Sequence, residues 1–175
     1  MRTKHIETER LSFSHWEEID LSLAEALCGD EMVTHFITKN GSFSTEQITQ
    51  RLRFEIESQK ECGLQYWPLF LKREEKFIGC CGLHAYDLEN QIAEFGVHLL
   101  PFAWGNGFAE EGATGVIDYA TARTDLSALF AGHHPDNHAS EKLLRKIGFQ
   151  FLSRNYYEPT GLEHPSYLLK LTANH

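Results

Sequence analysis

Two glycines separated by one residue stand where the sequence pattern changes from strand to helix. Gly105 and Gly107 follow segment 91–100, in which polar residues are spaced through apolar ones, and apolar residues then recur at helical intervals from Ala109 to Ala120. A helix that begins beside Gly107 points unpaired N–H groups and the positive end of its dipole at the loop. This pattern is typical of phosphate binding, but it also occurs in ordinary tight turns, and it lacks the Lys-Ser/Thr pair of a P-loop.

A second stretch with chemical potential begins at Asn137. Segment 134–149 predicts a loop and then a short helix that has apolar residues on one face and ends at Gly148. The first turn of this helix contains a hydroxyl group, that of Ser140. The two stretches therefore offer a glycine loop and a polar helix start in one chain.

Together the two stretches resemble the GNAT superfamily of N-acetyltransferases. In that family a Gln/Arg-x-x-Gly-x-Gly/Ala loop holds the pyrophosphate of acetyl-CoA, and a helix led by Asn and ending in Gly-Phe lines the pantetheine arm. Trp104 stands where the family usually has Gln or Arg, as in the branch of ribosomal-protein N-acetyltransferases, whose loop reads Trp-Gly-x-Gly-Tyr/Phe-Ala. The resemblance spans nearly the whole chain. It assigns acetyl-CoA binding to Trp104, Gly105, Asn106, Gly107, Phe108, Ala109 and Asn137.

The resemblance also implies a role for the strand at 91–100. In the family this strand parts from its neighbour, and the cofactor pairs with the exposed edge. The thioester and its carbonyl are therefore expected against main-chain groups of Val97, His98 and Leu99.

Acetyl transfer to an amine requires a neutral nitrogen, a polarised thioester carbonyl and a stabilised thiolate. Glu94 is the candidate base, because its position within an apolar strand would desolvate the carboxyl and raise its pKa. A solvent-facing residue or an ion-pair partner is an equal alternative. His98 shares the strand face of Glu94 and is the reserve base, with a hydrogen-bonded core histidine as its alternative.

The acid that would protonate the thiolate is less easily assigned. Many GNAT enzymes carry a Tyr seven residues after the helix-leading Asn, but Leu144 occupies that position here. The ribosomal-protein branch has a Ser three residues after the Asn, which matches Ser140. Its hydroxyl could hydrogen-bond the leaving sulfur or could cap the helix locally. Asn137 could likewise cap the helix, contact pantetheine amides, or do both.

These residues require a frame of alternating elements. The pattern predicts an α+β (α/β) fold with a mixed, mainly antiparallel sheet of about seven strands and helices on both faces, in the GNAT order, as a single domain over 1–175. A Ser14-x-x-Glu17 box predicts a helix that stops by Gly29, and a Ser44-x-x-Gln47 box predicts a helix over 44–60. Strands are expected near 6–14, 66–71, 76–86, 91–100, 126–132, 149–157 and 166–171.

Composition limits the possible partners. The chain has 175 residues, 42% of them hydrophobic, and a formal net charge of −9, which argues against nucleic acid as a partner. No apolar run is long enough for a membrane span, and four cysteines without metal or disulfide spacing suggest reduced thiols in a cytoplasmic protein. The spacing of His133, His134 and His138 matches no common metal site, so no metal is expected.

The sequence therefore predicts an acetyl-CoA-dependent N-acetyltransferase that works by direct attack of a primary amine. The leading acceptor is a protein N-terminal amine, and small cationic amines such as polyamines, amino acids or antibiotics are the alternative. A non-catalytic acyl-CoA-binding module on the same fold is a further alternative, because the tyrosine acid is missing.

Overall fold

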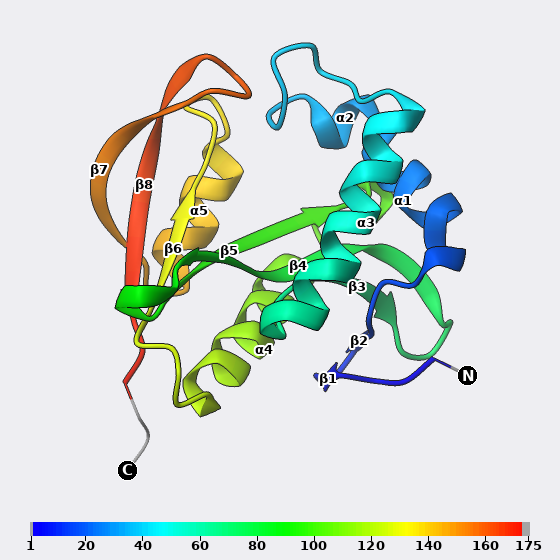
Figure 1. Cartoon of the computed structure of the whole chain (residues 1–175), viewed down its shortest axis with the longest axis horizontal. Coiled ribbons are helices and arrows are strands. Elements are labelled where there is room, and N and C mark those ends of the chain that lie inside the picture. Colours follow the sequence, from blue (N-terminus) through cyan, green and yellow to red (C-terminus); the bar gives the residue numbers. More distant parts are fainter. Residues whose placement is uncertain (1, 173–175) are drawn as a thin grey trace.

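A computed structural model describes residues 2–172, which form an eight-stranded sheet in the order β1-β2-β3-β4-β5-β6-β8-β7 (Figure 1). Neighbouring strands are antiparallel except for the parallel pair β5–β6. The sheet is mixed and mainly antiparallel, as predicted, and the expected first strand is divided into two. The strands are β1 (Ile6–Glu7), β2 (Leu11–Phe13), β3 (Tyr66–Leu71), β4 (Lys76–Asp87), β5 (Ile92–Leu99), β6 (Ala128–Gly132), β7 (Gln150–Tyr157) and β8 (Leu162–Lys170).

Helices cover both faces of the sheet. Successive strand residues face opposite sides, so the adjacent Tyr66 and Trp67 enter different cores. Tyr66 packs in the cluster that includes helices α1 and α3, whereas Trp67 belongs to the larger core, which contains Val116 of α4. Cys80 and Cys81 divide between the same two clusters as buried free thiols. The helices are α1 (Leu21–Cys28), α2 (Glu31–Thr34), α3 (Thr45–Cys62), α4 (Phe108–Ala122) and α5 (His138–Lys146).

Helix α3 begins where the sequence predicts. The Ser44 hydroxyl accepts a hydrogen bond from the Gln47 backbone N–H at 3.2 Å, and the Gln47 side chain accepts one from the Ser44 N–H at 2.8 Å. This reciprocal capping box satisfies two donors that a helix start leaves unpaired. The helix ends at Cys62 and is capped by Gly63, which has a left-handed φ of 68°.

The predicted start of the first helix at Ser14 is wrong. The Ser14 N–H instead bonds the carbonyl of Pro68, and the Trp16 backbone N–H bonds the Gln65 side chain at 3.0 Å. These contacts keep the chain extended along β3. The capping box forms three residues later, between Glu17 and Asp20, and α1 starts at Leu21.

Strands β5 and β6 separate after a short paired stretch. Only residues from Ile92 to Glu94 pair with β6, opposite Ala128 to Phe130. Beyond that point β5 runs away from β6, which follows β8 on the other side of the opening (Figure 1). The main-chain groups of β5 that face β6 are therefore left without strand partners along this edge.

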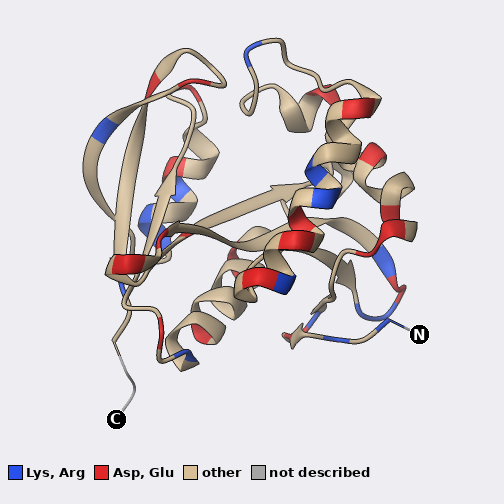
Figure 2. Cartoon of the chain, in the orientation of Figure 1, with Lys and Arg blue, Asp and Glu red and all other residues tan. Residues whose placement is uncertain are grey.

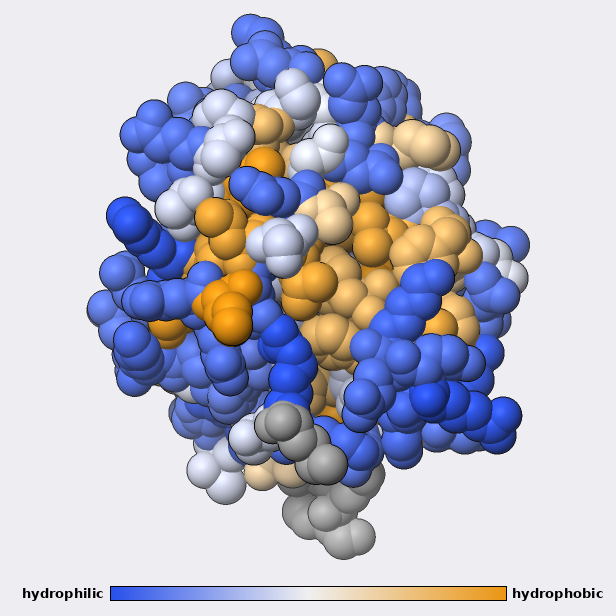
Figure 3. Space-filling model, turned by 90° about the vertical axis from the view of Figure 1, so that its right-hand side faces the viewer, coloured by the Kyte–Doolittle hydropathy of each residue, from blue (hydrophilic) through white to orange (hydrophobic). Residues whose placement is uncertain are grey.

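The surface is largely polar. Acidic residues are distributed over many elements (Figure 2). Apolar residues are concentrated in one central area of the face in Figure 3, surrounded by hydrophilic ones. None of the described helices combines the length and the apolar character needed to cross a lipid bilayer.

Candidate active site

A cavity of about 770 Å³ lies at the opening between β5 and β6. Its volume falls within the roughly 300–1,000 Å³ typical of small-molecule sites. Glu94, Val97, His98, Asn137 and Ser140 all line it, so the structure brings together residues predicted from two distant stretches. Aromatic side chains form much of the remaining wall: Phe36, Phe43, Phe54, Tyr66, Tyr86, Phe95, Phe130, Tyr156 and Tyr157.

The glycine loop lies beyond the end of β5, outside the lining of this cavity. The indole N–H of Trp104 donates to the carbonyl of Leu99 at 2.9 Å and so ties the loop to the strand. Gly105 and Gly107 have φ angles of 74° and 77°, which a residue with a side chain rarely adopts. Helix α4 starts directly after Gly107, and its first N–H groups point into the loop.

Two acidic residues in the first turn of α4 would oppose an anion there, but both carry cationic partners. Arg10 pairs with Glu111 at 2.6 Å and also donates to the carbonyl of Asn106 at 3.0 Å. Lys146 pairs with Glu110 at 2.7 Å. The loop therefore retains the positive character of a helix start, which suits a pyrophosphate.

The Glu94 carboxyl has the electrostatic character expected of a base. Burial raises its pKa above the ordinary glutamate value, and the nearby His84 partly opposes this effect. His98 has the opposite shift, because burial and the charges of Arg51 and His84 lower its pKa to about 4. A histidine with that pKa is neutral at pH 7 and a weak proton acceptor. The electrostatics therefore favour Glu94 over His98 as the base.

Helix α5 places Ser140 at the cavity. The side-chain oxygen of Asn137 accepts a hydrogen bond from the Ser140 backbone N–H at 3.1 Å and acts as the N-cap. Because Asn137 supplies the cap, the Ser140 hydroxyl is not required for it. The hydroxyl can therefore serve a group inside the cavity.

A family model described as an acetyltransferase (GNAT) domain matches residues 10–150. The chain belongs to the GNAT acetyltransferase family. As a GNAT N-acetyltransferase it takes its acetyl group from acetyl-CoA. The chain is 31% identical over 146 residues to an uncharacterised N-acetyltransferase, YoaA, of Bacillus subtilis, with 83% of this chain and 82% of that protein covered.

Solved structures share the fold at low identity. An acetyltransferase from Salmonella typhimurium, described as modifying the N-terminal serine of ribosomal protein L7/L12, has a TM-score of 0.80 at 15% identity over 94% of this chain and 97% of that one. A spermidine N-acetyltransferase from Vibrio cholerae, bound to CoA and spermine, has a TM-score of 0.78 at 15% identity with the same coverage. The two neighbours thus act on very different amines.

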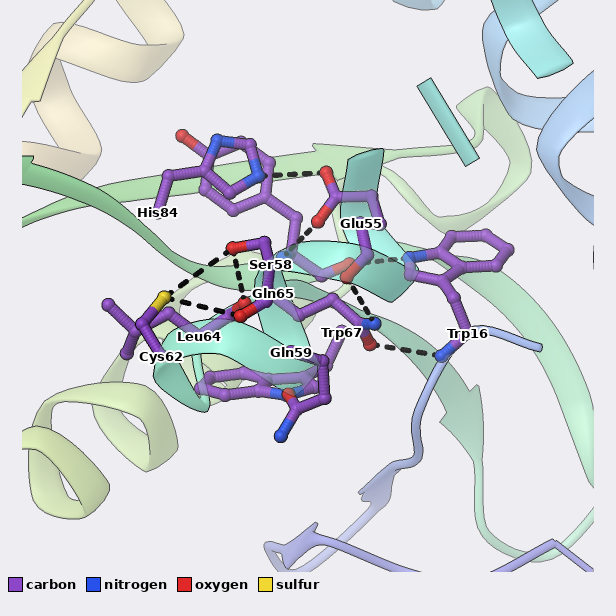
Figure 4. A network of polar contacts seen from close by, with 10 residues as sticks. Trp16, Glu55, Ser58, Gln59, Cys62, Leu64, Gln65, Trp67 and His84 are labelled. Carbon is purple, nitrogen blue, oxygen red and sulfur yellow. Dashed lines mark hydrogen bonds and ion pairs between the residues drawn. The ribbon is translucent and has the colours of Figure 1, made fainter. Parts of the chain in front are cut away.

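The GNAT pattern in the sequence did not predict a polar cluster in the wall of the cavity. The Glu55 carboxylate meets His84 Nε2 at 2.8 Å and accepts a bond from the Tyr66 backbone N–H at 2.9 Å (Figure 4). The His84 ring stacks on Tyr66 with 3.5 Å between ring centroids. A side chain at Gly96 would collide with the same Tyr66 ring. These residues come from four elements, α3, β3, β4 and β5, and no local signal links them.

The loop histidines have structural partners. His133 contacts the His134 carbonyl through Nδ1 at 2.7 Å and the Tyr167 hydroxyl through Nε2 at 3.2 Å. The His134 ring nitrogen accepts from the Asp136 N–H at 3.1 Å. Within residues 2–172, no group of His, Cys, Asp or Glu has the arrangement of a metal site.

Proposed function

We propose that this GNAT enzyme acetylates an N-terminal amine of a protein or peptide, with Glu94 as the general base and Ser140 as the group that stabilises the leaving thiolate. The observation that carries the proposal is the Glu94 carboxyl, whose pKa burial raises, on the cavity wall where β5 parts from β6. A carboxylate with a raised pKa accepts a proton from an ammonium ion more readily than an ordinary glutamate does.

The free edge of β5 suits an extended donor molecule. In the proposed arrangement the pantetheine arm of acetyl-CoA lies along Val97, His98 and Leu99, with its pyrophosphate at the loop from Trp104 to Ala109. The neutral amine attacks the thioester carbonyl, whose developing negative charge is stabilised by main-chain N–H groups of the strand. Glu94 first accepts the proton of the ammonium ion. A nitrogen–carbon bond then forms, the carbon–sulfur bond breaks, and the proton that the nitrogen loses passes to the departing thiolate, which the Ser140 hydroxyl hydrogen-bonds.

A small amine is the second candidate acceptor. The cavity is bounded by many aromatic side chains, and such walls also suit a compact organic amine. Thiol release from acetyl-CoA, measured with peptides, amino acids and polyamines as acceptors, compares the candidates directly. A peptide with a free N-terminus should have the highest kcat/KM, and a blocked N-terminus should abolish its turnover.

The role of Glu94 is tested with the best acceptor. Glu94→Gln keeps the shape of the side chain but cannot accept the proton, so kcat should fall roughly 10²-fold or more. The fall of the wild-type rate toward acidic pH should disappear in the variant, while KM for acetyl-CoA stays nearly unchanged. A variant that retains the wild-type rate and the acidic limb would exclude Glu94 as the base.

A further inference from the structure

Helix α3 turns one face toward the cavity, and most of the side chains on this face are polar. Gln47, Gln50, Arg51 and Phe54 line the cavity from this helix, at the spacing that brings residues onto one helical stripe. Glu55 lines it as well, one turn after Arg51. This face therefore presents one cation and one carboxylate to a bound molecule.

The carboxylate of Glu55 does not neutralise Arg51. One Glu55 oxygen meets His84 Nε2 at 2.8 Å and the other accepts the Tyr66 N–H at 2.9 Å. The Arg51 guanidinium lies over the Phe43 ring, 4.6 Å from its centroid, and makes no ion pair with any acidic side chain between residues 2 and 172. Arg51 is half-buried, has an aromatic contact and no carboxylate partner, and also lies close enough to the Cys28 thiol to oppose the rise that burial causes in the pKa of that thiol. Because a thiol is a weak hydrogen-bond acceptor, the other donors of the guanidinium fork stay available.

The charge of Arg51 acts inside the cavity. With burial as the larger cause, Arg51 contributes to lowering the pKa of His98 to about 4. Glu94, the other acidic residue of the lining, has a raised pKa because it is buried. Arg51 therefore places a positive charge in the cavity wall that forms no direct ion pair with either lining carboxylate, Glu55 or Glu94.

We infer that Arg51 binds a carboxylate of the acceptor, so that the substrate is an amine that also carries a carboxylate group. This inference rests on the proposed acetyl transfer and narrows its acceptor class. A guanidinium forms two parallel hydrogen bonds to a carboxylate, which fixes the orientation of the bound molecule as well as its affinity. The carboxylate could be that of a free amino acid or the acidic side chain of a peptide, and either would orient the amine toward Glu94.

The test uses acceptors in matched pairs that differ by one carboxylate. Alanine is compared with alaninamide, and the peptide Ala-Glu-Ala-amide with Ala-Gln-Ala-amide, while spermidine serves as a purely cationic amine. Thiol release gives kcat/KM, and calorimetry gives the affinity of each acceptor for the enzyme–CoA complex. We expect the carboxylate member of at least one pair to be favoured by roughly tenfold or more in both measurements.

Variants at two arginines of the same helix separate charge in the cavity from charge on the surface. Arg51→Gln should remove the preference for the carboxylate member, and Arg51→Lys, which keeps the charge without the fork, should restore part of it. Arg53→Gln is the matched control, because Arg53 is exposed and does not line the cavity. It should leave the preference unchanged.

The outcomes distinguish this inference from the proposed reaction. Turnover with equal rates for both members of each pair, or with spermidine preferred, would overturn the carboxylate assignment and leave the acetyl transfer intact. Binding of a carboxylate acceptor that depends on Arg51, without thiol release, would support the assignment and contradict the proposed acceptor chemistry. If the assays detect no turnover and no binding that depends on the carboxylate of the acceptor, both the carboxylate assignment and the proposed acetyl transfer are overturned.

Discussion

Glu94 shows how a single residue can serve chemistry at a cost to stability. Burial raises its pKa in the folded chain, so the ionised form is less favourable there than in the unfolded chain. The resulting destabilisation is absent below the unfolded pKa of about 4.3, grows as pH rises through that value, and is complete above the raised folded pKa. Glu94→Gln should therefore be more stable than the wild type at pH 7 and lose this advantage at pH 4.

Urea unfolding of the wild type and of Glu94→Gln at pH 7 and pH 4 measures this difference in the free energy of unfolding. Glu57→Gln is the control, because Glu57 is exposed on α3 and should change little at either pH. A Glu94→Gln variant that is destabilised at pH 7 would show that the carboxylate stabilises the fold, which contradicts the desolvation argument.

The variant Ser140→Ala tests whether the Ser140 hydroxyl stabilises the leaving thiolate, the role that a tyrosine has in many GNAT enzymes. Ser140→Ala should lower kcat by roughly tenfold to a hundredfold, the range expected when a thiolate loses one hydrogen bond. The helix cap should survive, because Asn137 accepts from the Ser140 backbone N–H, which the variant keeps. Steady-state kinetics with circular dichroism therefore separate the two roles, and a fall in helix content at an unchanged kcat would assign Ser140 to structure.

At the scale of an element, the loop before α4 depends on backbone conformation more than on packing. A Cβ at Gly107 would meet only Arg10, at 3.6 Å, but the φ of 77° is unfavourable for a β-branched residue. Gly107→Val should therefore distort the loop and abolish the rise in Tm that acetyl-CoA produces. Differential scanning fluorimetry with and without acetyl-CoA measures this loss.

Gly63 offers a matched control for the loop variant. It has a φ of 68°, and a Cβ there would meet an arginine, Arg123, at the same 3.6 Å, but it ends α3 outside the glycine loop. Gly63→Val should lower the Tm of the free protein while the shift with acetyl-CoA remains. If Gly107→Val and Gly63→Val lose the acetyl-CoA-induced rise in Tm equally, backbone strain in the folded protein explains the loss, and the result gives no support to acetyl-CoA binding at the glycine loop.

Elements whose signals are local could be predicted, and those that depend on distant contacts could not. The capping box of Ser44 and Gln47 is complete within four residues, and α3 forms as expected. Ser14 and Glu17 show the same spacing, yet bonds from this segment to the chain around Gln65 override it.

The residues of the candidate site also fall into two groups, those that the sequence indicated and those that depend on contacts between distant segments. The family pattern indicated Glu94 and Ser140, and both line the cavity. Glu55 lies on α3 and His84 on β4, 29 residues apart in the sequence, and only the packing of the helix on the sheet brings them together. Arg51 was missed for a related reason, because its lack of an acidic partner depends on the contacts of Glu55.

For the whole molecule, the narrow junction between β5 and β6 is the main structural fact. Three residue pairs join the part of the sheet from β1 to β5 with the part formed by β6, β8 and β7.

Acetyl-CoA at a hundredfold excess over Kd should add about 2.7 kcal/mol to the free energy of unfolding. At roughly 2–4 °C per kcal/mol for a chain of this size, Tm should rise by about 5–10 °C in a thermal scan. No shift at saturating acetyl-CoA would contradict binding to the folded state.

In the proposed arrangement, the open edge of β5 gives the donor molecule a second role. With acetyl-CoA lying along this edge, the substrate stands in for a missing length of strand, and each round of catalysis removes and replaces part of the sheet's own bonding. Amides near Val97 should exchange with deuterium fastest after CoA departs and before the next acetyl-CoA arrives. We therefore expect the enzyme to be most susceptible to proteolysis in that interval, so that its half-life in a cell depends on the concentration of acetyl-CoA.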